Sequence, residues 1–373
     1  MKKRLVSLDI FRGLCVAGMI LVDYPGTWEN RFPIFEHCGW QGITVADFIF
    51  PAFMFIMGVS MAFSIKSQIE KGISKKSINL KIFKRGVLLF VVGYAIELIT
   101  QDTGQYFATI RILGVLQRIG IVYILAALLY LNTSKRLFVA ANVTILFLYW
   151  AVLTLIMVPG YGKPDLSIFP TPEVIPNLAA WIDHAVLGGK VYFWTIPYDP
   201  EGILSTLPVI CSVAIGAVAG DFLRTKPLPI KTVKTFVVSG VILLTAGLLW
   251  SLLFALNKQL WTSSFVLVTG GASLLLLSVF YYIVEIKHIE KPFMFFRYYG
   301  YNALLSFSLA AVSGGLLYKI PVGNTDLQSF IFDKLFNSWL PEIHASYVFS
   351  FVFVGLWALF FRYLFNKKIA VRL

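Results

Sequence analysis

The chain alternates long apolar segments with shorter polar ones, a pattern typical of proteins that cross a membrane several times. An α-helix needs about 20 mostly apolar residues to span a bilayer. The sequence therefore predicts an all-α polytopic membrane protein with about ten spanning helices (10–11). The expected spans are 5–24, 45–65, 86–101, 112–131, 137–158, 202–223, 235–256, 264–286, 299–320 and 347–365.

The composition excludes a water-soluble protein. Hydrophobic residues make up 58% of the 373 positions and charged residues 14%. Soluble domains average about 45–50% apolar and about 25% charged residues. These values also exclude a disordered chain, because disordered chains have low hydrophobicity. The protein is expected to lie in the lipid bilayer.

The net charge of +13 is explained by topology. With a cytoplasmic N-terminus, most of the 32 lysines and arginines fall in cytoplasmic loops, above all in the segment 66–85. Membrane proteins keep Lys and Arg on the cytoplasmic side. Both termini are therefore expected in the cytoplasm, and no nucleic-acid partner is expected.

Three loops on the predicted outer side are long, namely 25–44, 159–201 and 321–346. Their aromatic, Pro and Gly content favours ordered loops that cover a site. Residues 177–187 have helical periodicity and are expected to lie along the membrane interface. The remaining loops are short, so residues 1–373 are expected to form a single transmembrane domain.

Ionisable residues inside predicted spans are candidates for function, because burying a charge in the bilayer is costly. Asp9, Arg12 and Asp23 fall on one stripe of the first span. An Asp9–Arg12 ion pair is the structural alternative for those two residues. Asp23 stands at the outer end of the span, directly before a long loop.

A second group of polar residues lies at the fourth predicted span. Arg111 and Arg118 are seven residues apart, so one helix face is expected to carry both, with Gln117 beside Arg118. A buried guanidinium needs a partner, and two remain open: Glu97 on the neighbouring span, or a phosphate-bearing ligand. Farther along, Glu201 opens the sixth span and Asn302 the ninth.

His37 is the candidate general base, because histidine exchanges protons near neutral pH. It lies in the loop before the second span, where Thr44 is a candidate N-cap and Asp47 follows. A lone loop histidine is often incidental. Cys15, Cys38 and Cys211 show neither a disulfide framework nor metal-ligand spacing, so no metal is expected.

Six motifs follow one another along the chain: SLDIFRG at 7–13, GMILVD at 18–23, HCGWQGITVAD at 37–47, GVLQRIG at 114–120, YDPEG at 198–202 and LNKQLW at 256–261. Together they resemble the transmembrane heparan-α-glucosaminide N-acetyltransferase family and its bacterial relatives. The resemblance implies transfer of an acetyl group from cytoplasmic acetyl-CoA to the amine of a terminal glucosamine across the membrane. It also implies a possible homodimer.

The motif match assigns the family's active histidine to His37. The family has an assisting asparagine where this sequence has Asp23. The lysosomal member carries a luminal domain that is not found here, which is expected of a bacterial relative. The expected location is then the bacterial cytoplasmic membrane, with an acceptor site that faces outward and takes an amino sugar or another glycan.

We assign roles to three groups of residues. Catalysis is assigned to His37, Asp23 and Asp47, and binding of acetyl-CoA to Arg12, Arg118 and Gln117. Acceptor binding is assigned to Trp40, Asp199, Glu201, Lys258, Trp261 and Asn302. Membrane-interface anchoring is the alternative role for the two tryptophans.

Other functions remain open. His37 fits either direct transfer or a transient acetyl-histidine. An O-acyltransferase acting on a lipid-linked glycan or wall polymer would use the same residues. A secondary transporter, with Arg118 and Glu97 as coupling residues, is the alternative outside the enzymes.

Overall fold

The computed structural model describes residues 5–100, 110–225 and 228–371, and the statements below concern these ranges. The chain forms long helices, short helical turns and one small hairpin. In order they are α1 (Val6–Asp23), η1 (Pro33–Phe35), α2 (Val45–Glu70), α3 (Lys75–Thr100), α4 (Val115–Asn132), α5 (Lys135–Leu155), α6 (Leu178–Leu187), η3 (Phe193–Thr195), α7 (Thr206–Arg224), α8 (Pro229–Trp250), α9 (Ser263–Phe280), η4 (Tyr281–Ile286), η5 (Lys291–Phe293), α10 (Met294–Tyr301), α11 (Ala303–Lys319), β1 (Pro321–Val322), β2 (Thr325–Asp326), α12 (Leu327–Phe332), η6 (Asp333–Asn337) and α13 (Glu342–Asn366).

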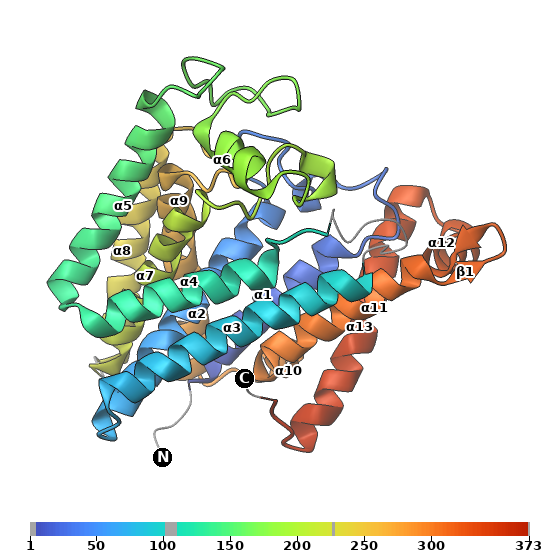
Figure 1. Ribbon diagram of the computed structural model, residues 1–373. Coiled ribbons are helices and arrows are strands. Elements are labelled where there is room, and N and C mark those ends of the chain that lie inside the picture. The colour runs from blue at the N-terminus through green and yellow to red at the C-terminus, as the bar shows by residue number, and fades with distance from the viewer. Residues whose placement is uncertain (1–4, 101–109, 226–227, 372–373) are drawn as a thin grey trace.

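The long helices pack side by side, and the long loops gather with α6 at one end of the bundle (Figure 1). We call this the loop end. Backbone hydrogen bonds join its segments, from Gly26 to Ser346 and from Gly42 to Leu256. At the other end, Ser7 bonds Glu285, and the amide of Val371 donates to Asn302. We call this second end the terminal end.

The chain is an all-α, multi-pass membrane protein. Within the described residues, seven helices are long and apolar enough to span a bilayer. An eighth is obtained when the pair 291–301 and 303–319, bent by 76°, is taken as one span. Each expected span has a helix at its position, but α1 and α3 are not among the seven. α1 carries Asp9, Arg12 and Asp23, which reduce its apolar character.

Several expected boundaries differ from the observed helix ends by more than a turn, and two of them affect the site described below. α3 begins at Lys75 instead of 86, because the basic segment before the apolar run is also helical. α8 ends at Trp250 instead of 256. The chain then makes a loop that side chains hold in place: Asn257 accepts from the amide of Leu260, and Thr262 accepts from the amide of Asn257.

Small residues let the central helices approach closely. A Cβ on Gly58 of α2 would collide with the backbone of Val213 in α7, and one on Gly216 with the backbone of Phe55. Between helices in a membrane, such contacts stabilise packing through dispersion, since lipid is as apolar as the helix surface. This packing fixes α2, and with it the loop that precedes α2.

Candidate functional site

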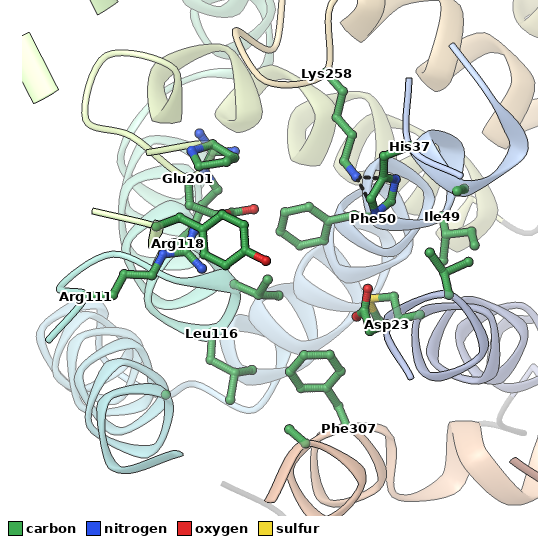
Figure 2. A pocket seen from close by; sticks show the side chains of 18 of the residues that line it. Asp23, His37, Ile49, Phe50, Arg111, Leu116, Arg118, Glu201, Lys258 and Phe307 are labelled. Atoms are coloured by element: carbon green, nitrogen blue, oxygen red, sulfur yellow. Dashed lines mark hydrogen bonds and ion pairs between the residues drawn. The ribbon is translucent and has the colours of Figure 1, made fainter. Parts of the chain in front are cut away.

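A cavity of about 500 Å³ opens at the loop end between α1, α2, α4 and α11. We call it the loop-end cavity. Figure 2 shows His37 and Lys258 on one part of its wall, Asp23 on another, and Glu201, Arg111 and Arg118 across from Asp23. Phe307 and Leu116 supply apolar surface. The cavity therefore combines an apolar interior with charged side chains from distant parts of the chain.

His37, Asp47 and Lys258 form the most compact polar cluster. His37 Nδ1 lies 2.9 Å from Asp47 Oδ1, and Lys258 Nζ lies 3.4 Å from the same oxygen. Lys258 Nζ is also 3.0 Å from His37 Nδ1 and 3.3 Å from Nε2. The side chain of Asp47 is fully buried, whereas that of His37 is 40% exposed. A buried carboxylate thus holds an imidazole that a substrate can reach.

The sequence around Asp47 explains why this carboxylate is so well fixed. Thr44 caps α2 as expected, and Asp47 accepts a hydrogen bond from the Thr44 amide at 3.1 Å, which completes a capping box. Asp47 Oδ2 also accepts from the amide of Cys38 at 3.0 Å. Asp47 therefore holds both the start of α2 and the loop that carries His37.

Arg111 joins the two carboxylates of the YDPEG motif. Its Nε donates to Asp199 at 2.8 Å, and Nη2 donates to Asp199 at 2.6 Å and also to Glu201. Burial alone would lower the pKa of Arg111, but the charges of Asp199 and Glu201 raise it well above its usual value. Because this buried cluster is paired internally, it stiffens the wall of the cavity.

Asp183 supports the same wall from α6. It accepts from the amide of Ile203 at 2.9 Å and from that of Asp199 at 3.3 Å. Burial raises the pKa of Asp183 to about 7. The α6 helix, which the sequence predicts over 177–187, is therefore tied to the segment that presents Glu201.

Arg118 and Gln117, from the first turn of α4, are both 1% exposed and both line the loop-end cavity. Arg118 donates to Ser205 and Thr206, and its guanidinium lies 5.3 Å from the ring centre of Trp261. Trp261 itself is buried against Phe50 and donates to Ser212 at 3.1 Å. Arg118 Nη1 and Gln117 Nε2 have no partner among the described residues.

A second cavity, of about 300 Å³, lies toward the terminal end. We call it the terminal-end cavity, and its lining includes Arg12, Ser60, Arg85 and Asn302. Arg12 pairs with Asp9 at 3.2 Å and also donates to Ser60. The two cavities adjoin, because four residues line both of them: Met19, Val115, Leu116 and Phe307.

The structure brings most of the sequence-predicted site residues to the loop-end cavity. Those that line it are Asp23, His37, Asp47, Gln117, Arg118, Glu201, Lys258 and Trp261. Asp199 is not among the lining residues, but it is bonded to Arg111, which lines the cavity.

Three predicted residues lie elsewhere. Trp40 packs against Phe169 and Tyr198 and donates to the carbonyl of Leu166 at 2.9 Å. Arg12 lines only the terminal-end cavity. Asn302, expected to bind the acceptor, also lies there, bonded to the backbone of Ile369 at 2.9 Å. Asn302 lies at the terminal end because it precedes α11, whose other end, at Lys319, leads into the 321–346 segment of the loop end.

Sequence reasoning did not assign a role to Arg111 or Arg85. The seven-residue spacing from Arg118 was a usable signal for Arg111, although α4 begins only at Val115. Arg85 lies among other cations near the start of α3, and its sequence context gives no signal. Among the described residues, no group of three or more His, Cys, Asp and Glu side chains is placed to hold a metal ion.

The sequence pattern of one family, described as heparan-alpha-glucosaminide N-acetyltransferase, catalytic, matches residues 4–227. The chain belongs to this family. It is 30% identical over 347 residues to the human heparan-alpha-glucosaminide N-acetyltransferase, and 30% identical over 349 residues to the mouse protein. Each alignment covers 81% of this chain and 52% of the relative, so the chain spans about half the length of these curated relatives.

Proposed function

We propose that the protein transfers an acetyl group from cytoplasmic acetyl-CoA to the amine of a glucosamine-type sugar on the outer side of the membrane. The observation that carries this proposal is the exposed imidazole of His37, held by the buried Asp47 in a cavity that adjoins a second, cation-lined cavity. Membership of the family supplies the acyl chemistry, and the geometry is consistent with it.

His37 acts as the general base in this proposal. When Nδ1 donates its proton to Asp47, Nε2 holds the lone pair that accepts a proton from the acceptor amine. The amine nitrogen bonds to the acetyl carbon, the C–S bond breaks, and the thiolate takes the proton from His37. Lys258 is close enough to stabilise the negative oxygen that forms on the acetyl carbon.

Acetyl-CoA is assigned to the terminal-end cavity. Arg12 and Arg85 line that cavity and offer positive charge to its phosphates. The pantetheine arm then passes Met19, Val115, Leu116 and Phe307, the residues that line both cavities, and presents the thioester near His37. In this arrangement the donor and the acceptor enter from opposite ends of the bundle.

The proposed orientation follows from the charge pattern of the loops. Both termini face the cytoplasm, the loop end faces outward, and α1 and α3 complete a set of about ten spans. The cytoplasmic membrane of a bacterium is the proposed location and a homodimer the proposed assembly. No metal takes part in the proposed reaction.

The test is thiol release by the purified protein with acetyl-CoA and a panel of amino sugars and glycans. General-base catalysis contributes about 10²–10⁴-fold, so His37→Ala should lower the rate by that factor. His184→Ala is the matched control, because His184 is an exposed histidine of α6 at the same end. Full activity of His37→Ala would exclude His37 as the base.

The same assay separates the alternatives. Acetyl-histidine trapped in the absence of acceptor would indicate the two-step route, and product bearing an ester would indicate O-acylation. Uptake of a sugar into sealed vesicles without consumption of thioester would indicate a transporter and contradict the proposal.

A further inference from the structure

The carboxylate of Asp23 faces the loop-end cavity and has no hydrogen-bond partner in the described part of the chain. Asp23 is the last residue of α1 and lines the cavity. No side chain or amide within the described ranges donates a hydrogen bond to it. The positive groups close enough to act on its charge are Lys258 and, when protonated, His37. A carboxylate in this position, among apolar residues such as Ile49 and Phe307, has its lone pairs available to a ligand (Figure 2).

Two other carboxylates of the cavity are already engaged. Asp47 accepts from Cys38, Thr44 and His37, and Glu201 accepts from Arg111. Lys258, the cation nearest to His37, is paired with Asp47. Of these three, Asp23 is therefore the carboxylate best placed to bond a group that enters the cavity.

The cavity as a whole also favours a cation. Among the described residues, its lining has four carboxylates, Asp23, Asp47, Glu97 and Glu201, against three cations, Arg111, Arg118 and Lys258. In an apolar surrounding this excess of negative charge is weakly screened and attracts positive ligands. A neutral hydroxyl compound gains nothing from this field.

We propose that Asp23 binds the protonated amino group of the acceptor and so makes a cationic amine the preferred acceptor over a neutral hydroxyl compound. This inference rests on the proposed function. Before transfer, the ammonium passes one proton to Asp23, which releases it to solvent. The neutral amine then attacks the acetyl carbon, and its second proton leaves through His37 to the CoA thiolate. One amide and one thiol form, and one proton is released overall.

The experiment measures binding of glucosamine and of glucose by calorimetry, because the two sugars differ in the amine that carries the charge. The wild-type protein, Asp23→Asn and Glu97→Gln are compared in detergent, each without acetyl-CoA. Asn keeps the shape of the side chain and removes its charge. Glu97→Gln removes another carboxylate of the same cavity. It tests whether the preference for glucosamine depends on Asp23 or on any negative charge in the cavity.

We expect the wild-type protein to bind glucosamine at least tenfold more tightly than glucose, since charge-assisted hydrogen bonds are the stronger ones. Asp23→Asn should reduce this preference to less than threefold, and Glu97→Gln should retain most of it. An unchanged preference in Asp23→Asn, an equal loss in Glu97→Gln, or no preference in the wild type would overturn the inference.

Thiol release by the wild-type protein, measured on the same samples, separates this outcome from failure of the proposed function. Acetyl-CoA-dependent release with an amine, combined with an unchanged preference in Asp23→Asn, overturns the role of Asp23 alone. Absence of release with every acceptor counts against the proposed function, whatever the binding shows.

Discussion

The loop-end and terminal-end cavities adjoin, yet their charged side chains are arranged differently. At the loop end, His37, Asp47 and Lys258 contact one another, and Arg111 holds Asp199 and Glu201. Two arginines line the terminal-end cavity, which has no carboxylate in its described lining. Arg12 lies against Asp9 and Ser60, and Arg85 lies 4.9 Å from the ring centre of Tyr123.

This difference fits the two proposed roles, proton transfer at the loop end and acetyl-CoA binding at the terminal end. A network whose members orient one another suits proton transfer, which requires fixed geometry. Cations on long, partly exposed side chains suit the binding of an anion that approaches from solvent. In the sequence both sets look alike, as charges in or beside apolar segments.

The largest effect is expected from a substitution that no longer holds the imidazole of His37 in its orientation. Asp47→Asn replaces the carboxylate that accepts from His37 Nδ1 by an amide that can favour the wrong tautomer. We expect kcat to fall by about 10²–10⁴-fold, with the KM for acetyl-CoA unchanged. Steady-state kinetics measure both values.

Thr44→Val is the matched control for Asp47→Asn. It removes the cap of α2, at a cost of about 1 kcal/mol in stability, and leaves the carboxylate in place. If Thr44→Val lost as much activity as Asp47→Asn, the role of Asp47 would be structural.

A medium effect is expected at the terminal-end cavity. Arg85→Gln removes one of its two lining cations, so the KM for acetyl-CoA should rise about five- to tenfold, equivalent to about 1–1.4 kcal/mol. The kcat and the KM for the acceptor should stay unchanged. Arg136→Gln, at an exposed position of α5 outside both cavities, is the control. A change in acceptor KM alone would contradict the division between the cavities.

The smallest effect concerns stability near the loop end. Burial raises the pKa of Asp183 to about 7, against an ordinary value of 3.8. Between pH 3.8 and about 7, the carboxyl group of Asp183 is ionised in the unfolded chain but protonated in the folded protein. The contribution of Asp183 to stability is therefore full below about pH 4, falls as the pH rises to 7, and is constant above that.

Thermal unfolding in detergent between pH 5 and 8 measures this contribution. The melting temperature of the wild type should fall with pH more steeply than that of Asp183→Asn, which has no proton to lose. Parallel curves for the two proteins would show that Asp183 does not titrate in this range.

Much of the fold followed from the sequence because hydrophobicity is a local property. Each expected span has a helix at its position, the α6 helix was expected over 177–187, and Thr44 was expected as the cap of α2. The motifs also led to the family. Helix ends were less predictable, as at Trp250, because side chains of the following loop decide where the helix stops.

The sequence by itself determined the positions of the helices and the family, and it led to the proposal for His37. Only the tertiary structure decided which distant residues meet: Lys258 reaches His37 across 221 positions, and Arg111 reaches Asp199 across 88. It also placed Asn302 at the terminal-end cavity and not at the loop-end cavity. Periodicity fixes the face on which a side chain lies, whereas the neighbour of that face depends on close packing between helices, as at Gly58 and Gly216.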